Sequence, residues 1–240
     1  MMRTFLFSGF TRTQLKHGRD RTMRIVIFAN GVIENPEAEI ARWVGKEDIV
    51  VAANGGSSHL LKCGIYPQHI IGDLDSLSPE MREDLMAHTT TFHSYPPQKD
   101  ETDLELALLW AASQNSTAQI VILGAMGGRP DQALANLLLL ALPELEDRDV
   151  RIAGDGWVIL VIHCGETRTI SGAMGDTLSL IPLGGEVRGI KTTGLSYPLR
   201  NETLTFGPAR GVSNVFAASH AAISVEAGIL WCFHQHTVEQ

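Results

Sequence analysis

The sequence predicts an α/β protein in which a parallel sheet with helices on both faces is followed by a smaller antiparallel sandwich or barrel. In the first half the apolar runs are nearly continuous rather than alternating, which is typical of strands buried on both faces. Helical patterns alternate with these runs. After about Asp147 the chain changes to short β-rich segments separated by glycines, which indicates antiparallel strands joined by turns.

Each element of the first half is bounded by local signals. Asn35 and Ser78 are expected N-caps because each precedes a proline, which fits the first helical position. Thr102 and Glu105 have the spacing of a capping box. Strands are predicted at 24–29, 48–53, 69–71, 90–95 and 119–124, and helices at 35–44, 57–62, 78–87, 102–115 and 131–142.

The chain divides into three parts. Residues 1–22 are interpreted as a disordered extension or the product of an upstream start codon, with a targeting segment as the alternative, because Met23 directly precedes the first strand. The α/β part is placed at 23–147 and the β-rich part at 148–240. Predicted β segments in the last part are 150–154, 157–163, 166–170, 177–183, 186–193, 211–217, 221–227 and 228–234.

Composition excludes two classes of function. The net charge is −8, and residues 1–24 hold six basic residues and one acid, so the rest of the chain is strongly acidic. Nucleic-acid binding requires a basic face, and spanning a membrane requires about 18 consecutive apolar residues, so neither is expected. Cys63, Cys164 and Cys232 form no CxxC pair, and we expect reduced, buried thiols in a cytoplasmic protein.

Polar clusters follow the strands of the α/β part. They lie at 30–31, 54–56, 72–76, 99–100 and 127–129, and the carboxyl ends of parallel strands meet at one edge of a sheet, where ligands bind. Asp73 and Asp75 would project to the same side of an extended loop and form a hard oxygen site for Mg²⁺. The alternative is that Asp75 or Ser76 caps the turn before Pro79.

Two further clusters have the chemistry of a phosphate site. Lys99 and Asp100, just before the helix that begins near Thr102 and Asp103, suit a phosphate and its metal, or else form a solvated charged turn. Arg129 follows two glycines and offers a fork of donors, unless the segment is a plain connection with Asp131 as N-cap. Neither GxxxxGK[ST] nor GxGxxG occurs.

The histidines carry a weaker signal. His234 and His236 near the C-terminus are either metal ligands or incidental residues of a tail. His163 lies inside a predicted strand and is interpreted as a core residue.

Six motifs together resemble the thiamine pyrophosphokinase family and occur in its order. They are GDLDS (72–76), KDETD (99–103), LGAMGGRPDQALAN (123–136), SLIPL (179–183), TTGLSYPL (192–199) and RGVSN (210–214). The resemblance covers about residues 24 to 233. It implies a Rossmann-like nucleotide-binding catalytic domain, a C-terminal thiamine-binding β-sandwich and a homodimer with its active site at the subunit interface. The implied reaction is Mg²⁺-dependent transfer of pyrophosphate from ATP to the hydroxyethyl oxygen of thiamine, releasing AMP.

The resemblance also implies roles for individual residues. Catalysis falls to Asp73, Asp75, Asp100 and Asp103, of which the first two and Asp103 would hold Mg²⁺. ATP and its phosphates would contact Ser76, Lys99, Thr102, Arg129 and Asp131. The thiamine pocket would include Tyr197, Ser213 and Asn214.

Two positions depart from the family pattern. Asn54 stands where the family usually has an aspartate, and Gln132 where it usually has a histidine. These departures would suit a non-catalytic thiamine or nucleotide sensor. A pyrophosphokinase acting on another alcohol such as a pterin and a metal-dependent phosphohydrolase are further alternatives.

Overall fold

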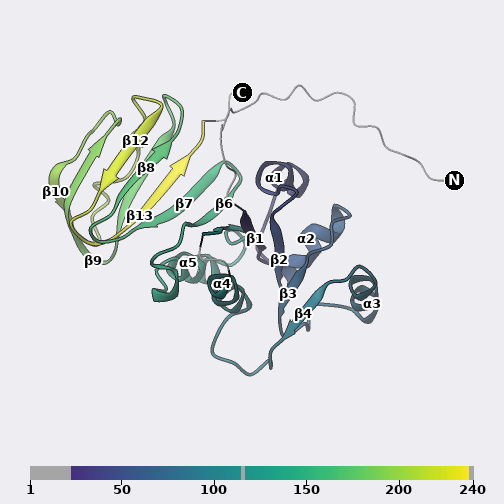
Figure 1. The fold of residues 1–240 in the computed structure, drawn as a ribbon. Helices are drawn as coiled ribbons and strands as arrows, with labels where there is room; N and C mark the ends of the chain where they lie inside the picture. The colour runs from purple at the N-terminus through teal and green to yellow at the C-terminus, as the bar shows by residue number, and fades with distance from the viewer. Residues whose placement is uncertain (1–22, 115–116, 238–240) are drawn as a thin grey trace, which may run out of the picture.

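In the computed structural model, which describes residues 23–114 and 117–237, a continuous sheet runs through both halves of the chain (Figure 1). Its first six strands pair in parallel in the order β4-β3-β2-β1-β5-β6. Their bounds are β1 Arg24–Phe28, β2 Ile49–Ala53, β3 His69–Gly72, β4 Thr91–Ser94, β5 Gln119–Leu123 and β6 Val150–Gly154. The order reverses between β1 and β5, which is the point where such sheets bind ligands.

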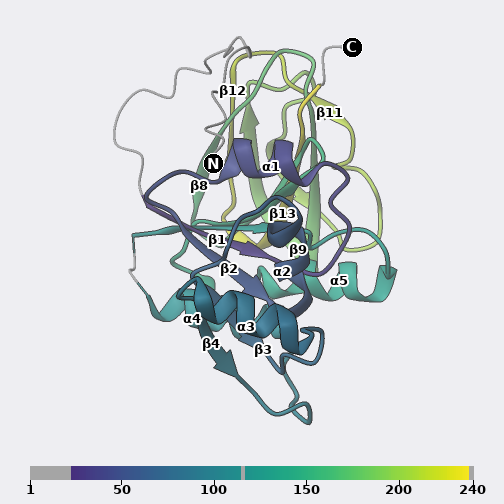
Figure 2. The same cartoon turned by 90° about the vertical axis from the view of Figure 1, so that its right-hand side faces the viewer.

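Helices cover both faces of the parallel strands, as the sequence predicts. α1 (Pro36–Trp43), α2 (Ser57–Lys62) and α3 (Pro79–Ala87) pack on the face that carries Val26 and Phe28, and they face the viewer in Figure 2. α4 (Asp103–Ser113) and α5 (Pro130–Leu139) lie on the opposite face, where Ile25 and Ile27 point. Single turns of 3₁₀ helix occur at Asn54–Gly56 and Pro143–Leu145.

The predicted helix starts are mostly confirmed. The side chains of Asn35, Ser78 and Thr102 accept hydrogen bonds from backbone N–H groups three residues later, as N-caps do. The start of α5 differs, because Arg129 is at the N-cap position and Pro130 is the first helical residue. Asp131 is therefore inside the first turn and is not the N-cap.

The β-rich part is an antiparallel sandwich, as the resemblance implies. Its strands are β7 Trp157–Ile162, β8 Thr167–Ser171, β9 Thr177–Thr193, β10 Arg200–Leu204, β11 Asn214–Val215, β12 His220–Ser224 and β13 Ala227–Gln235. The first part of β9 pairs with β13 and β11, and its last part pairs with β12 and β10, so this strand belongs to both layers. Leu160, Leu180, Ile223 and Leu230 fill the core between the layers.

Three sequence expectations need correction. The segment 150–154, assigned to the antiparallel half, pairs in parallel with β5 as well as antiparallel with β7, which makes the sheet continuous. The segments 177–183 and 186–193 are one strand, with irregular pairing near Gly184. β10 was not predicted, because Leu204 is its one buried residue and a polar edge strand has no apolar pattern. The domain boundary at 147 stays a prediction, and residues 1–22 lie outside the described part.

The cysteines are free but not all buried. Cys232 is buried, Cys63 is partly buried and Cys164 is exposed, so the expectation of buried thiols is wrong for the last two. Among the described residues, no helix is long and apolar enough to cross a membrane.

Candidate active site

The loops that follow β2 and β3 meet the start of α4 at the carboxyl edge of the parallel sheet. Asn54 follows β2, Asp73 and Asp75 follow β3, and Asp103 is the first residue of α4. Because α4 packs against β2 and β3, the first turn of the helix comes next to both loops. The predicted convergence of polar clusters at one edge is present here.

Asn54 joins the two aspartates of the β3 loop. Its Nδ2 donates hydrogen bonds to Asp73 Oδ1 at 2.8 Å and to Asp75 Oδ1 at 2.9 Å. Its backbone is left-handed (φ 43°), a conformation that asparagine tolerates better than most residues. Its Oδ1 is buried and has no hydrogen-bond partner among the described residues. The sequence signal for this residue is its place in the polar cluster 54–56 directly after a strand, which predicts its location at the sheet edge but not its hydrogen bonds to both aspartates.

The loop from Asp73 to Asp75 is a turn and not the extended segment that the sequence suggested. Leu74 has φ 63° and buries its side chain in the core, while the Asp75 N–H donates to Asp73 Oδ1 at 3.3 Å. The carboxylates of Asp73 and Asp75 both face the Asn54 amide because of this turn. The two carboxylates are close to each other as expected, but the cause is a turn and not an extended loop.

Lys99 links two of the carboxylates. Its Nζ lies 2.9 Å from Asp103 Oδ1 and 3.7 Å from Asp73 Oδ2, and its side chain is only 10% exposed. Burial alone would lower the pKa of Lys99, but the carboxylates of Asp103 and Asp73 raise it above its ordinary value. The lysine therefore stays charged within the cluster, and the alternative of a solvated charged turn does not describe it.

Gly72 makes the close approach of these groups feasible. A Cβ at this position would lie 2.8 Å from Asp103 Cγ and 2.9 Å from Asn54 Cβ, and φ is +147°. Only glycine fits this backbone and this space without a shift of its neighbours.

The donor set suits a hard divalent cation. Carboxylates from two segments and the unpartnered amide oxygen of Asn54 are the oxygen ligands that Mg²⁺ prefers. Hydrogen bonding of the Asp75 carboxyl group to the side chains of Asn54, Asp73 and Ser76 keeps the pKa of Asp75 below its usual value. Asp75 is therefore ionised at neutral pH. In the described structure the ligand oxygens of these three carboxylates do not all lie within 4.8 Å of one another, and Lys99 lies beside Asp73 and Asp103.

Several predicted phosphate residues lie outside this cluster. Asp100 is exposed in the loop before α4. Arg129 pairs with Asp131 at 2.6 Å, and both side chains are more than half exposed. The hydrogen bonds between these two side chains raise the pKa of Arg129 and lower the pKa of Asp131. Thr102 uses its hydroxyl to accept from the Glu105 N–H.

The predicted thiamine residues form a second cluster on the sandwich. Asn214 Nδ2 donates to the Tyr197 carbonyl at 2.7 Å, and the Tyr197 N–H donates to Asn214 Oδ1 at 3.1 Å. The Tyr197 side chain is left 71% exposed. Ser213 has φ 62°, and its N–H donates to Ser179 Oγ. Within the described ranges, no hydrogen bond or ion pair joins this cluster to the acidic one.

The doubly wound α/β layer, with acidic loops at its carboxyl edge and a β-sandwich joined to it, places the chain in the class of α/β proteins whose ligand site lies at the carboxyl ends of the parallel strands. Two family models identify the group within this class. The model described as thiamin pyrophosphokinase, catalytic domain, matches residues 40–153. The model described as thiamin pyrophosphokinase, vitamin B1 binding domain, matches residues 161–230. The chain belongs to the thiamine pyrophosphokinase family.

Individual relatives agree over most of the chain. Thiamine pyrophosphokinase of Bacillus subtilis (strain 168) is 28% identical over 208 residues, which are 87% of this chain and 97% of that protein. The crystal structure of the B. subtilis protein superposes with a TM-score of 0.77 at 27% identity, over 90% of this chain and 100% of that chain. The Geobacillus thermodenitrificans structure gives a TM-score of 0.76 at 29% identity, over 90% of this chain and 99% of that chain.

Proposed function

We propose that the chain transfers pyrophosphate from ATP to the hydroxyethyl oxygen of thiamine, giving thiamine diphosphate and AMP. The observation that carries this proposal is the acidic cluster of Asp73, Asp75 and Asp103, joined by Asn54 and Lys99, in a chain of this family. Its position at the carboxyl edge of the sheet is where α/β proteins hold nucleotides.

Asp73, Asp75 and Asp103, with the free oxygen of Asn54, are the residues that would hold Mg²⁺. When bound, the ion would neutralise phosphate oxygens and polarise the phosphorus under attack. The first turn of the eleven-residue helix α4 adds partial positive charge at the same place. Lys99, which lies within the acidic cluster, would contact phosphate oxygens there. Roles in ATP binding for Ser76, Thr102, Arg129 and Asp131 are part of the same proposal, and Arg129 and Asp131 would have to give up their mutual ion pair to take part.

Asp103 is our candidate for the group that accepts the proton of the attacking hydroxyl. Its ion pair with Lys99 at 2.9 Å fixes the orientation of the carboxylate before substrate binds. Asp100 is the alternative, and it is exposed in the loop before α4. Attack on the β-phosphorus would break its bond to the α-phosphate oxygen, and the electron pair would leave with AMP.

We propose a homodimer in which Tyr197, Ser213 and Asn214 help form the thiamine pocket at the subunit interface. Two observations support it: the two clusters do not touch within one described chain, and Leu134 and Leu138 of α5 are each about half exposed. Apolar side chains of this size are often covered by a partner. The acidic edge would favour the cationic thiazolium ring. A cytoplasmic location is also proposed, supported by the three free cysteines.

The test is AMP release from Mg-ATP with thiamine, without an acceptor and with a pterin alcohol. We expect AMP with thiamine only. ATP consumption without an acceptor would indicate a phosphohydrolase, AMP with the pterin alone would indicate the other pyrophosphokinase, and no AMP in any arm would indicate a sensor.

The Asp73→Asn variant tests the site itself. We expect turnover to fall by roughly 10²-fold or more at saturating Mg²⁺, because an oxygen ligand loses its charge, while thermal unfolding barely shifts. Asp147→Asn, the same change at an exposed residue between the two parts of the chain, is the matched control and should keep full activity. Near-normal turnover of Asp73→Asn would refute the metal assignment.

A further inference from the structure

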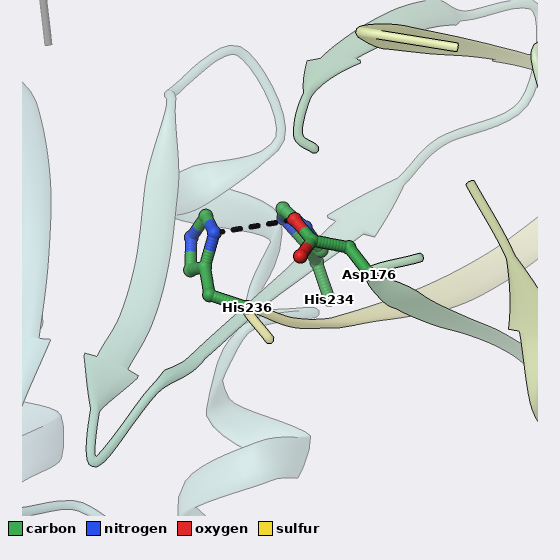
Figure 3. A group of neighbouring side chains, drawn as sticks. All are labelled: Asp176, His234 and His236. Carbon is green, nitrogen blue, oxygen red and sulfur yellow. Dashed lines mark hydrogen bonds and ion pairs between the residues drawn. The ribbon is translucent and has the colours of Figure 1, made fainter. Parts of the chain in front are cut away.

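A second group of ionisable side chains lies at one end of the sandwich, away from the sheet edge described above. Asp176 directly precedes β9, His234 is near the end of β13, and His236 follows that strand. Figure 3 shows the carboxylate beside the His234 ring, with the His236 ring facing them. His234 is buried within a strand, so the interpretation as a tail residue is wrong for His234.

The distances within this group are short. Asp176 Oδ2 lies 2.8 Å from His234 Nε2 and 3.4 Å from His236 Nδ1. One ligand atom from each residue can be chosen so that all three lie within 4.8 Å of one another, and no other trio of His, Cys, Asp or Glu in the described residues meets this condition. The side chains of Asp176 and His234 are only 1% and 3% exposed, while that of His236 is 32% exposed.

Neighbouring groups hold these side chains in place. Asp176 Oδ1 accepts from the Thr237 N–H at 2.8 Å, and Oδ2 accepts from the Ala173 N–H at 2.9 Å. The His234 ring packs against Phe216, with centroids 4.9 Å apart. Gly172 comes so close that a Cβ there would lie 3.0 Å from His234 Nε2. A site fixed by its surroundings in this way needs little rearrangement to bind an ion.

We propose that Asp176, His234 and His236 form a zinc site. Bonds of about 2.0–2.2 Å at tetrahedral angles separate ligand atoms by about 3.3 Å, and the measured 2.8 and 3.4 Å bracket that value. Two imidazoles and one carboxylate suit Zn²⁺ far better than Mg²⁺, which requires oxygen ligands. The His236 side chain is 32% exposed, so water can reach the group, and a water molecule would be the fourth ligand.

The ion would brace the segment that carries the proposed thiamine residues. The Phe216 N–H donates to the Asp176 carbonyl at 2.9 Å, and β11 pairs with the start of β9 through Asn214 and Val215. An ion joining Asp176 to β13 therefore fixes β9, β11 and β13 at one end of the sandwich. The site has a structural role in this proposal and takes no part in phosphoryl transfer.

The test uses the full chain, stripped of metal by a chelator and then dialysed. Titration with Co²⁺ should give the intense visible absorption of a four-coordinate ion and saturate at one equivalent per chain, and Zn²⁺ should displace it while Mg²⁺ does not. His236→Ala should weaken Zn²⁺ binding by more than about 100-fold. Added Zn²⁺ should raise the melting temperature of the wild-type chain and not that of this variant.

Two control variants separate this site from adventitious binding. His220→Ala removes an exposed histidine of β12, and Cys164→Ser removes the exposed thiol, and both should bind Zn²⁺ as the wild-type chain does. Equal binding by His236→Ala, or no saturable site in the wild-type chain, would overturn the proposal and leave a metal-free hydrogen-bond network. X-ray absorption of the wild-type zinc form decides without any variant: two imidazoles are expected, and sulfur in the first shell would refute the site.

Discussion

Replacing Asn54 by aspartate gives a direct measure of how acidic the proposed Mg²⁺ site is. The change keeps the size of the side chain and suits the left-handed backbone, but it places a negative oxygen where Nδ2 now donates to Asp73 at 2.8 Å. Repulsion between two such charges at about 4 Å is about 1 kcal/mol in water and about 4 kcal/mol at an effective dielectric constant of 20. Protonating an aspartate at pH 7 costs about 4 kcal/mol, which sets the upper limit.

The free energy of unfolding of Asn54→Asp should therefore fall by about 1–4 kcal/mol without divalent ions, and the melting temperature by about 2–16 °C. Asp75, at 2.9 Å from the same amide, adds repulsion in the same direction. Adding Mg²⁺ should restore the variant and raise its melting temperature more than that of the wild-type chain, because four aspartates bind the ion more tightly than three and an amide.

Thermal unfolding in chelator and in excess Mg²⁺ provides the measurement. Asn35→Asp is the matched control, because it makes the same change at the N-cap of α1, where aspartate caps as well as asparagine. If Asn54→Asp melts like the wild-type chain in chelator, or if Mg²⁺ raises both melting temperatures equally, the bridging amide and the cation site are both refuted.

Two further predictions concern backbone space and pH. Gly72→Ala should reduce both stability and turnover. Gly154 has a similar φ of +137°, but an added Cβ there would meet no atom within 4 Å, so Gly154→Ala should reduce stability alone. Equal turnover of the two variants in the AMP assay would contradict this prediction. Burial alone would raise the pKa of Asp149, but its bonds to Arg151 and Gln119 and the nearby Arg168 hold it below the ordinary value. A depressed pKa in the folded state adds stability above the unfolded pKa of about 3.9, and this is lost as pH falls further. Urea unfolding should therefore show a gap between the wild-type chain and Asp149→Asn at pH 7 that shrinks below about pH 4, and a constant gap would be the contrary result.

The elements that the sequence predicted correctly are those set by local chemistry. Asn35, Ser78 and Thr102 cap helices through side-chain bonds to N–H groups three residues away, so the signal and the structure share one short segment. The direction of Val150–Gly154 could not be predicted this way, because an apolar run does not encode whether its neighbour is parallel. Gly184 interrupts an apolar pattern, yet pairing with β13 continues on both sides of it.

The site shows the same division. Strand topology is enough to predict that Asp73 and Asp103 lie at one edge of the sheet. Asp73 comes directly after a strand and Asp103 begins a helix, and both positions can be predicted from the sequence. The contacts of Asp73 with Asn54 and Asp75 occur where Asn54 and Leu74 have left-handed backbones, which no spacing rule indicates. The KDETD motif does not distinguish the roles of Asp100 and Asp103 either. In the structure α4 begins at Asp103, whose carboxylate pairs with Lys99, whereas Asp100 is exposed in the preceding loop.

Charge explains why this chain can hold asparagine at position 54. Asp73, Asp75 and Asp103 together with Lys99 carry a net charge of −2, which one divalent cation neutralises. An aspartate at 54 would leave one charge uncompensated after a single ion binds, and a second cation or a cationic substrate would then be needed to balance it. Asn54 instead donates to two carboxylates and keeps the site folded while no ion is bound. We infer that in this chain one ion is sufficient for charge balance before ATP arrives, and that Lys99, which already compensates part of the charge, can turn from Asp103 to the phosphates as they enter.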